Sequence, residues 1–300
     1  MSYPPPWTGL TFTSKLHSTP SPELAHLKLP TPFVAVITGG SRNIGAATAK
    51  AFVHAGATGL ILTATNLSEA LLSTKKEIED IAPSIKVTVL AADQSDPSTA
   101  GKIAEAVKNE HGGRLDALIN NAAVVSTHPS AYSQNDIAAI QVDQLSTTMS
   151  VNLVGKFAII KALLPLLLET DGGAKTIVNV TSALSHFASM QAMGYNLSQL
   201  ATNRLTEAVA ECYGNRDVLA FAVHPGIVAT IPRPIGTPEG GDQMAVDDVG
   251  LCGGFLVWLL SEKKKWLSGR YLSANWDVDE LEGKKEDIVK GDKLKVRMVT

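Results

Sequence analysis

Short runs of apolar residues alternate with amphipathic segments along most of the chain. The run "FVAVIT" at 33–38 leads into the turn "GGSRNIG", and the apolar positions of "AATAKAFVHAG" then have helical spacing up to Gly56. Further apolar runs lie at 60–64, 86–92, 115–120, 175–181, 218–224 and 269–274. Because these runs are continuous rather than alternating, they predict parallel strands buried on both faces.

The segments between the runs predict the helices that cover such a sheet. They lie at 67–82, 97–110, roughly 133–169, 195–213 and 247–260. Together these patterns predict a single doubly wound, Rossmann-like α/β domain over residues 31–275, with a seven-stranded, mainly parallel sheet and helices on both faces.

The two ends of the chain differ from this pattern. Residues 1–30 are rich in proline and have little periodicity, which predicts an extended N-terminal arm that lies on a neighbour or is disordered. Residues 276–300 are highly charged and predict a peripheral tail. We find no boundary that indicates a second domain.

Composition and charge exclude several classes of function. With 45% apolar residues in 300, the chain can bury a large core, and its 26 basic and 29 acidic residues are mixed, which excludes a nucleic-acid footprint. Cys212 and Cys252 are too few for a disulfide framework or a metal site. We find no signal peptide, and the apolar segments "FAIIKALLPLLLE" and "CGGFLVWLL" look too short or interrupted to cross a bilayer. We therefore expect a cytoplasmic protein without a membrane partner.

The turn after the first strand is a candidate nucleotide site. In doubly wound sheets ligands bind beyond the carboxyl ends of the strands, and Gly39 and Gly45 allow a pyrophosphate to approach the backbone at a helix N-terminus. An NAD site usually has an acidic residue after the second strand, but "TATN", which includes Thr65, has none. Arg42 can instead pair with a 2′-phosphate, so NADP(H) is favoured. Asp93, after the third strand, could accept a hydrogen bond from the adenine amine.

Further motifs follow in a fixed order. They are "NNAA" at 120–123, Asn152 in the long helix, Ser182 in "NVTSALS", Tyr195 thirteen residues later, and "HPGIVAT" at 224–230. With "TGGSRNIG", this ordered set resembles the short-chain dehydrogenase/reductase family over roughly residues 32–275.

The resemblance implies a role for each matching position. The phosphates would be held by Gly39, Ser41, Arg42, Ile44 and Gly45. The adenosine half would lie near Thr65 and Asp93 and be supported by Asn120 and Ala122. The nicotinamide carboxamide would contact Ile227 and Thr230. Catalysis in the family uses asparagine, serine, tyrosine and lysine, which would be Asn152, Ser182, Tyr195 and position 199. Position 199 is glutamine.

Gln199 keeps the position of the missing lysine without its charge. It lies one helical turn after Tyr195 and on the same face, and it can still donate to ribose hydroxyls. Without a cation the pKa of Tyr195 stays higher, and the loss of one preorganised electrostatic group typically lowers turnover about 10²–10³-fold. A protonated phenol suits reduction better than oxidation.

Other residues are weaker candidates to replace the lysine. Lys156 follows Asn152 by one turn, and we favour the interpretation that it lies on the helix surface. His128 and His186 lie in loops that should overhang the pocket, where we expect them to line the rim without transferring a proton. The segment 231–246, with several prolines and glycines, is predicted to be a substrate lid. Leu184, Phe187, Met190 and Met193 would either contact a bulky apolar substrate or serve as packing residues.

Three functions fit these features. The leading hypothesis is an NADP(H)-dependent reductase of a C=O or C=N bond in a bulky, mostly apolar small molecule of secondary metabolism. An iminium substrate carries its own positive charge and needs no tyrosine proton. The alternatives are a redox-silent cyclase, isomerase or dehydratase on the same scaffold, and an NADP(H)-sensing binding module. The family resemblance also implies a homodimer or homotetramer built on the helices that start near 148 and 194.

Overall fold

A seven-stranded parallel sheet forms the centre of the protein. The computed structural model describes residues 6–125, 137–187, 192–229 and 245–298. The strands run in the order β3-β2-β1-β4-β5-β6-β7, and every neighbouring pair is parallel. They are β1 (Val34–Thr38), β2 (Gly59–Ala64), β3 (Lys86–Ala91), β4 (Ala117–Asn120), β5 (Thr176–Val180), β6 (Leu219–His224) and β7 (Tyr271–Ser273). The predicted fold class is confirmed, and the change in strand order between β1 and β4 marks the expected ligand crevice.

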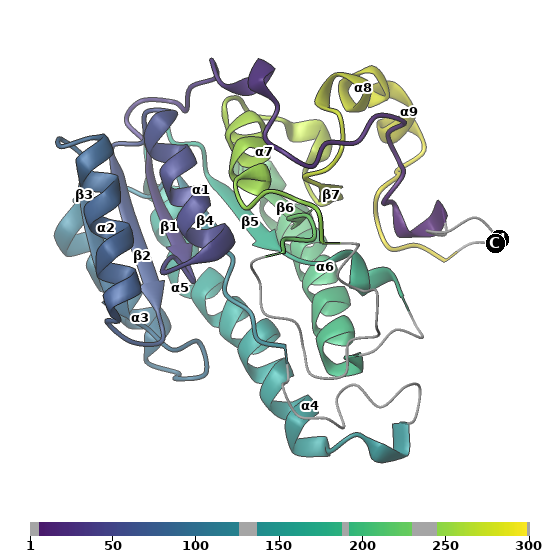
Figure 1. Ribbon diagram of the computed structural model, residues 1–300, viewed down its shortest axis with the longest axis horizontal. Helices are drawn as coiled ribbons and strands as arrows, with labels where there is room; N and C mark the ends of the chain where they lie inside the picture. Colours follow the sequence, from purple (N-terminus) through teal and green to yellow (C-terminus); the bar gives the residue numbers. More distant parts are fainter. Residues whose placement is uncertain (1–5, 126–136, 188–191, 230–244, 299–300) are drawn as a thin grey trace.

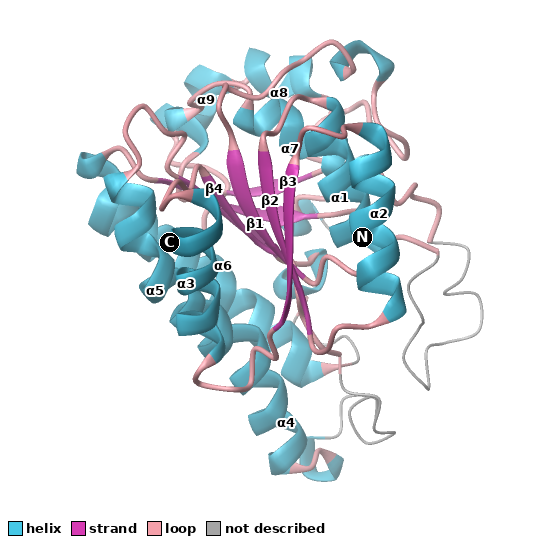
Figure 2. Ribbon diagram, turned by 90° about the vertical axis from the view of Figure 1, so that its left-hand side faces the viewer, coloured by secondary structure: helices cyan, strands magenta, loops and turns pink. Residues whose placement is uncertain are grey.

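Helices cover both faces of the sheet (Figures 1 and 2). One face carries α1 (Asn43–His54), α2 (Glu69–Ile81) and α7 (Leu251–Leu260), and the other carries α3 (Thr99–His111), α5 (Lys156–Glu169) and α6 (Met193–Tyr213). Apart from the edge strand β3, the strands between these layers are almost wholly buried, which explains their continuous apolar runs. Short 3-10 turns lie at Pro6–Thr8, Pro22–Leu24, Ile137–Ala139, Ala183–His186, Gly214–Arg216 and Lys265–Leu267.

The long helical region predicted over 133–169 is interrupted by a π-helical turn. Its described part consists of α4 (Val142–Met149), the π-helical turn Ser150–Gly155 and then α5. Gly155 explains the close packing here, since a Cβ at this position would lie 2.5 Å from the carbonyl oxygen of Gln94. The turn also carries Asn152, so it positions a predicted site residue.

The helical stretch Val142–Glu169 is long and apolar enough to cross a membrane. Its best 18-residue window has a mean hydropathy of 1.8, and the stretch of 28 residues is longer than the apolar segment 157–169 that looked too short to cross a bilayer. Half of that window is buried inside the protein, as in the core helix of a soluble protein, which passes the same test. Length and composition are therefore weak evidence for a membrane span.

The N-terminal arm packs against the C-terminal part of its own chain. Figure 1 shows it passing over α7 and running beside α8 (Val278–Gly283) and α9 (Lys285–Lys290). The indole of Trp276 donates to the carbonyl oxygen of Gly9 at 2.9 Å, and a backbone bridge joins Leu16 to Trp276. For the described residues of the arm, this packing replaces the two sequence-based alternatives of disorder and docking on a neighbour.

The charged tail is also more firmly packed than its composition suggested. Leu281 of α8 and Ile288 of α9 are fully buried in the main hydrophobic core. Asp277 caps α8 by accepting from the backbone N–H of Glu280 at 2.9 Å. Charged residues dominate the sequence here because the short helices expose most of their surface, while single apolar residues anchor each one.

Candidate active site

The glycine turn joins β1 to α1 with little room for side chains. Gly39 has φ +68°, and a Cβ on Gly45 would lie 2.1 Å from the carbonyl oxygen of Gly39, so only glycine fits at position 45. The side chain of Asn121 donates to the carbonyl oxygens of Thr38 and Gly39 at 2.9 and 3.3 Å. The backbone N–H of Ala122 donates to Thr38 Oγ1 at 3.0 Å. Asn121 and Thr38 thus brace the turn, a role that the sequence analysis missed.

The outer part of this crevice is open to solvent. Arg42 precedes the first residue of α1 and is exposed, and no described carboxylate forms an ion pair with it. Thr65, after β2, is exposed too. Asp93 is exposed, but its Oδ1 accepts from the backbone N–H and the hydroxyl of Ser95, both at 2.8 Å. These positions surround the end of the sheet where the sequence places the adenosine half of a dinucleotide.

Other predicted cofactor residues lie deeper in the turn and the sheet. Ile44 is buried in the first turn of α1, and the carbonyl oxygen of Ser41 accepts from Thr74 Oγ1 at 3.2 Å. Asn120 is buried at the end of β4, where its Nδ2 donates to Oδ1 of Asn179 in β5 at 2.9 Å. Asn120 therefore ties two central strands together beneath the crevice.

Ser182 and Tyr195 meet at the centre of the predicted site. Ser182 follows β5, and Tyr195 lies in the first turn of α6. Burial raises the pKa of the Tyr195 phenol, while a side-chain hydrogen bond with Ser182 lowers it in part. The phenol therefore stays protonated at neutral pH and can donate a hydrogen bond.

Gln199 occupies the turn of α6 below Tyr195 and is completely buried. Its Nε2 and Oε1 are buried without a hydrogen-bond partner among the described residues. Buried amide groups are nearly always satisfied, so a pair without partners needs an explanation. Hydroxyl groups of a bound ribose would supply both a donor and an acceptor to this amide.

Asn152 acts on the backbone rather than on Tyr195. Its Oδ1 accepts from the N–H of Val124 at 2.8 Å, and its Nδ2 donates to the carbonyl oxygen of Val124 at 2.8 Å and to Ser198 Oγ at 3.0 Å. Ser198 Oγ in turn donates to the carbonyl oxygen of Tyr195 at 2.7 Å. Asn152 thus links the loop after β4 to the helix that carries the phenol.

Lys156 is not a surface lysine, and our preferred interpretation of it was wrong. The side chain is completely buried and donates from Nζ to the carbonyl oxygen of Val180 at 2.8 Å. Burial lowers the pKa of this amine to about 7. The one-turn spacing from Asn152 identified the helix face correctly, but it did not show that β5 covers that face.

His186 packs away from the phenol, against the last strand. Its ring meets the ring of Tyr271 edge-on, with centroids 4.5 Å apart, and burial lowers its pKa. His128 lies outside the described residues. Leu184, Phe187 and Met193 are partly buried around the Ser182 loop and the start of α6, and Met190 lies outside the described residues.

The segment after β6 is fixed by Asp247. The backbone N–H of Ile227 donates to Asp247 Oδ2 at 2.6 Å, and the carbonyl oxygen of Ile227 accepts from the N–H of Asp247 at 3.1 Å. Thr230 and residues 231–244 of the predicted lid lie outside the described residues. The start of this segment is thus held at the end of the sheet near Ser182.

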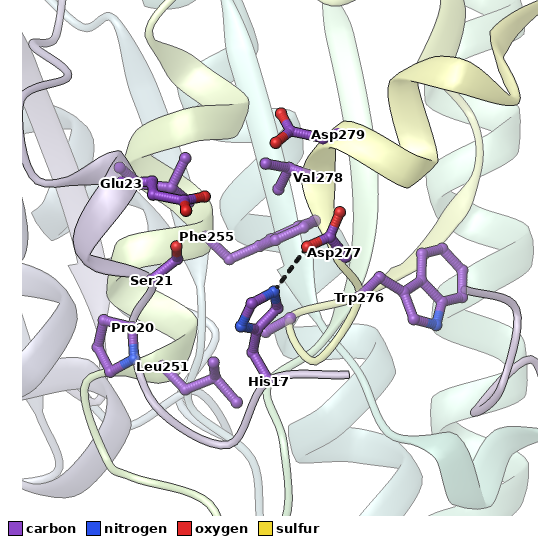
Figure 3. Close-up of a pocket in the computed structure, with 12 residues that line it drawn as sticks. His17, Pro20, Ser21, Glu23, Leu251, Phe255, Trp276, Asp277, Val278 and Asp279 are labelled. Carbon is purple, nitrogen blue, oxygen red and sulfur yellow. Dashed lines mark hydrogen bonds and ion pairs between the residues drawn. The ribbon is translucent and has the colours of Figure 1, made fainter. Parts of the chain in front are cut away.

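Two of the small pockets among the described residues bear on the location of the site. One has a volume of about 10 Å³ and is lined by Tyr195, Leu145 and Thr148, so it can hold about one water molecule. The other, of about 20 Å³, lies under the N-terminal arm, where His17 pairs with Asp277 (Figure 3). Neither pocket is large enough for a substrate, but only the first is lined by a predicted catalytic residue, Tyr195.

Comparisons with known proteins identify the family and agree with the fold. The model of a family described as short chain dehydrogenase matches residues 33–233. "Short chain dehydrogenase citE" of Monascus ruber is 40% identical over 98% of this chain and 99% of its own length. "Short chain dehydrogenase pgmD" of Aspergillus terreus is 36% identical over 99% and 97%. Among solved structures, a short chain dehydrogenase of Shigella flexneri complexed with NADP has a TM-score of 0.70 at 22% identity, covering 83% of this chain and 99% of that one.

Proposed function

The chain belongs to the short-chain dehydrogenase/reductase family, and on that premise we propose that it is an NADP(H)-dependent reductase. The proposed reaction is hydride transfer to a C=O or C=N bond of a bulky, mostly apolar small molecule of secondary metabolism. One observation carries the proposal: α6 brings Tyr195 to Ser182 and places the partnerless amide of Gln199 one turn further on.

The described residues fit a nicotinamide dinucleotide. Gly39 and Gly45 leave the backbone free to approach a pyrophosphate at the start of α1, and the buried amide of Gln199 matches ribose hydroxyls. The exposed, unpaired guanidinium of Arg42 suits a 2′-phosphate, and no carboxylate follows β2. When bound, the cofactor supplies the hydride.

In this proposal the protein provides the proton and orients the substrate. The phenol of Tyr195, kept protonated by burial, donates to the substrate oxygen, and the hydroxyl of Ser182 holds the same oxygen. Gln199 adds no positive charge to favour a tyrosinate, so reduction is favoured over oxidation. A C=N substrate that is already an iminium needs no proton from Tyr195 and tolerates the neutral glutamine best.

The test is cofactor binding followed by turnover. The purified full chain is titrated with NADPH and NADH, and Arg42→Ala is the matched variant. We expect NADPH to bind more tightly than NADH, and Arg42→Ala to weaken NADPH binding about 10–100-fold while NADH binding changes little, since a charge-assisted pair is worth about 1.5–3 kcal/mol. Equal affinities, with no effect of the substitution, would remove the case for NADP(H).

The neutral Gln199 also supports a second function without redox chemistry. A cyclase, isomerase or dehydratase would use Tyr195 and Ser182 only as hydrogen-bond donors, and orientation alone can lower a barrier by several kcal/mol. A panel of ketones, imines and reactive polycarbonyl compounds with NADPH separates the two. Stoichiometric loss of NADPH supports the reductase, and product formed without such loss supports the second function.

A further inference from the structure

Ser182 lies beyond the end of the regular sheet. The last β4–β5 pair is Asn120 with Asn179, and the last β5–β6 pair is Val180 with Val223. The chain that carries the catalytic hydroxyl thus leaves β5 where strand pairing stops. Because a misplacement of about 1 Å can lower turnover about 10²-fold, something other than the strand ladder has to hold this segment.

His224 extends the pairing to β6 with its side chain. The backbone N–H of Thr181 donates to the carbonyl oxygen of Val223 at 2.8 Å, and the N–H of Ala183 donates to Nδ1 of His224 at 3.2 Å. Both residues that flank Ser182 are therefore bonded to the end of β6. His224 is itself fixed, because its carbonyl oxygen accepts from the N–H of Ala274 at 2.8 Å.

The imidazole is suited to remain an acceptor. Because Nδ1 accepts, the ring proton of the neutral form lies on Nε2. Burial, with a smaller effect of the nearby His186, lowers the pKa of His224 to about 4, so the ring stays neutral at physiological pH. Nε2 has no hydrogen-bond partner among the described residues, so the ring is held to them by Nδ1.

Lys156 holds the same segment from the opposite edge. The peptide group between Val180 and Thr181 points its N–H towards β6 and therefore its carbonyl oxygen towards β4, which has already ended. Lys156 Nζ donates to this oxygen at 2.8 Å from α5. A buried amine thus takes the place of the missing strand on that side.

We propose that His224 and Lys156 are positioning residues for Ser182, which hold the end of β5 between them and set the place of the catalytic hydroxyl. The inference rests on the proposed function, since it assigns the two side chains a role in the same reaction. Neither residue reaches the substrate in this proposal. Both act through backbone groups within two residues of Ser182.

The decisive comparison is between His224→Asn and His224→Leu, whose new side chains both branch at Cγ. His224→Asn keeps an acceptor at the position of Nδ1, whereas His224→Leu has a similar volume without one. We expect His224→Leu to lower kcat about 10–100-fold with the Kd for NADPH changed less than about threefold, and His224→Asn to restore most of that loss. If both variants lose kcat equally, or if His224→Leu keeps it, the role of the acceptor is refuted.

Lys156→Met removes the other hydrogen bond at nearly constant length. We expect kcat to fall without a comparable rise in KM, because the substitution moves Ser182 and leaves the pocket surface unchanged. An unchanged kcat would remove Lys156 from the proposal.

Amide hydrogen exchange gives a readout that does not depend on turnover. Protection of the Ala183 amide should be high in the wild type and in His224→Asn, and should fall about fivefold or more if the bond, worth about 1 kcal/mol or more, is lost. If the wild type reduces no substrate but the Ala183 amide is protected as expected, the proposed function fails while His224 still holds the loop. If the Ala183 amide of the wild type is unprotected, the inference is overturned. This measurement on the wild type decides the matter even if His224→Leu does not fold.

Discussion

At the scale of single residues, the proposed site has a neutral glutamine where the family resemblance implies a lysine. Gln199 lies where a cation would lower the pKa of Tyr195, and its buried amide has no described partner. The protein instead leaves Tyr195 with a pKa raised by burial. In the proposed reductase the phenol is therefore a hydrogen-bond donor first, and we expect its low acidity to limit the rate where the substrate requires a proton.

Restoring the cation should raise the rate of ketone reduction. For Gln199→Lys we expect kcat on a simple ketone to increase about 10–100-fold, because a preorganised charge stabilises the developing alkoxide. Gln199→Met is the control, since it fills the same space without charge or hydrogen bonds and should not raise kcat. Initial rates of NADPH oxidation provide the measurement, and equal rates for the wild type and Gln199→Lys would contradict the role assigned to the charge.

Removing the buried amine of Lys156 should change how stability depends on pH. The folded-state pKa of about 7 lies below the unfolded value, so the unfolded chain binds more protons between the two values and the wild type gains stability as pH rises. From about pH 7 to about pH 9 the gain is about 2 kcal/mol, and below pH 7 the cost of burial is constant. Lys156→Met should lack this rise and be at least as stable as the wild type at pH 7.

Urea unfolding at the two pH values measures the difference. Lys161→Met, a substitution of a less buried lysine of α5, is the control and should follow the wild type. If the free energy of unfolding changes with pH equally in the wild type and in Lys156→Met, the pKa of the Lys156 amine is not lowered in the folded protein.

Sequence reasoning could locate the chemical groups but not all of their supports. Ser182 at the end of a strand and Tyr195 with Gln199 on one helix face follow from strand and helix periodicity. The burial of Lys156 and the acceptor role of His224 do not, because periodicity gives the face on which a residue lies and not what covers it. These contacts depend on where β4 and β6 end, which no local pattern encodes.

At the scale of elements, strands were predicted more accurately than helices. All seven apolar runs became strands, since burial on both faces leaves few polar residues in them. Before β5 one long helical region was predicted at roughly 133–169, and the structure divides its described part by the π-helical turn at Ser150–Gly155. Its cause is tertiary, because Asn152 binds the backbone of Val124 and Gly155 packs against Gln94.

A methyl group at Gly155 should therefore destabilise the protein. Its Cβ would lie 2.5 Å from the carbonyl oxygen of Gln94, whose side chain also binds the carbonyl oxygens of Ala122 and Val151. We expect Gly155→Ala to lower the free energy of unfolding by about 1–3 kcal/mol, the usual cost of overpacking. Thermal or urea unfolding measures this.

Gly101 in α3 is the matched control. A Cβ at Gly101 meets no atom within 4 Å, so Gly101→Ala should be neutral or stabilising by up to about 1 kcal/mol. If both alanine substitutions have the same effect, the close approach at Gly155 does not limit stability.

At the scale of the whole molecule, three exposed apolar side chains favour association. Val154 in the π-helical turn, Phe157 in α5 and Leu197 in α6 are 59%, 52% and 45% exposed. The helices that carry them are the ones on which the sequence analysis placed an oligomer interface. We propose that these side chains form one face, which a second copy of the chain covers in a two-fold symmetric dimer.

A charge on this face should separate the subunits. We expect Phe157→Glu to shift the protein from dimer to monomer in light scattering, because a buried, unpaired carboxylate is costly at an interface. Leu72→Glu, on α2 and 50% exposed, is the control and should leave the dimer intact. A monomeric wild type would contradict the proposal directly.

The packing of the arm on the far end of its own chain bears on how the protein is made. Gly9 is bonded to a residue 267 positions later, and Ser14 to one 266 positions later. A ribosome releases the first residues of a polypeptide long before the last, so the arm emerges when the surface it will cover does not yet exist. Throughout translation its apolar side chains stay exposed to chaperones and proteases, and docking of the arm is among the last steps of maturation.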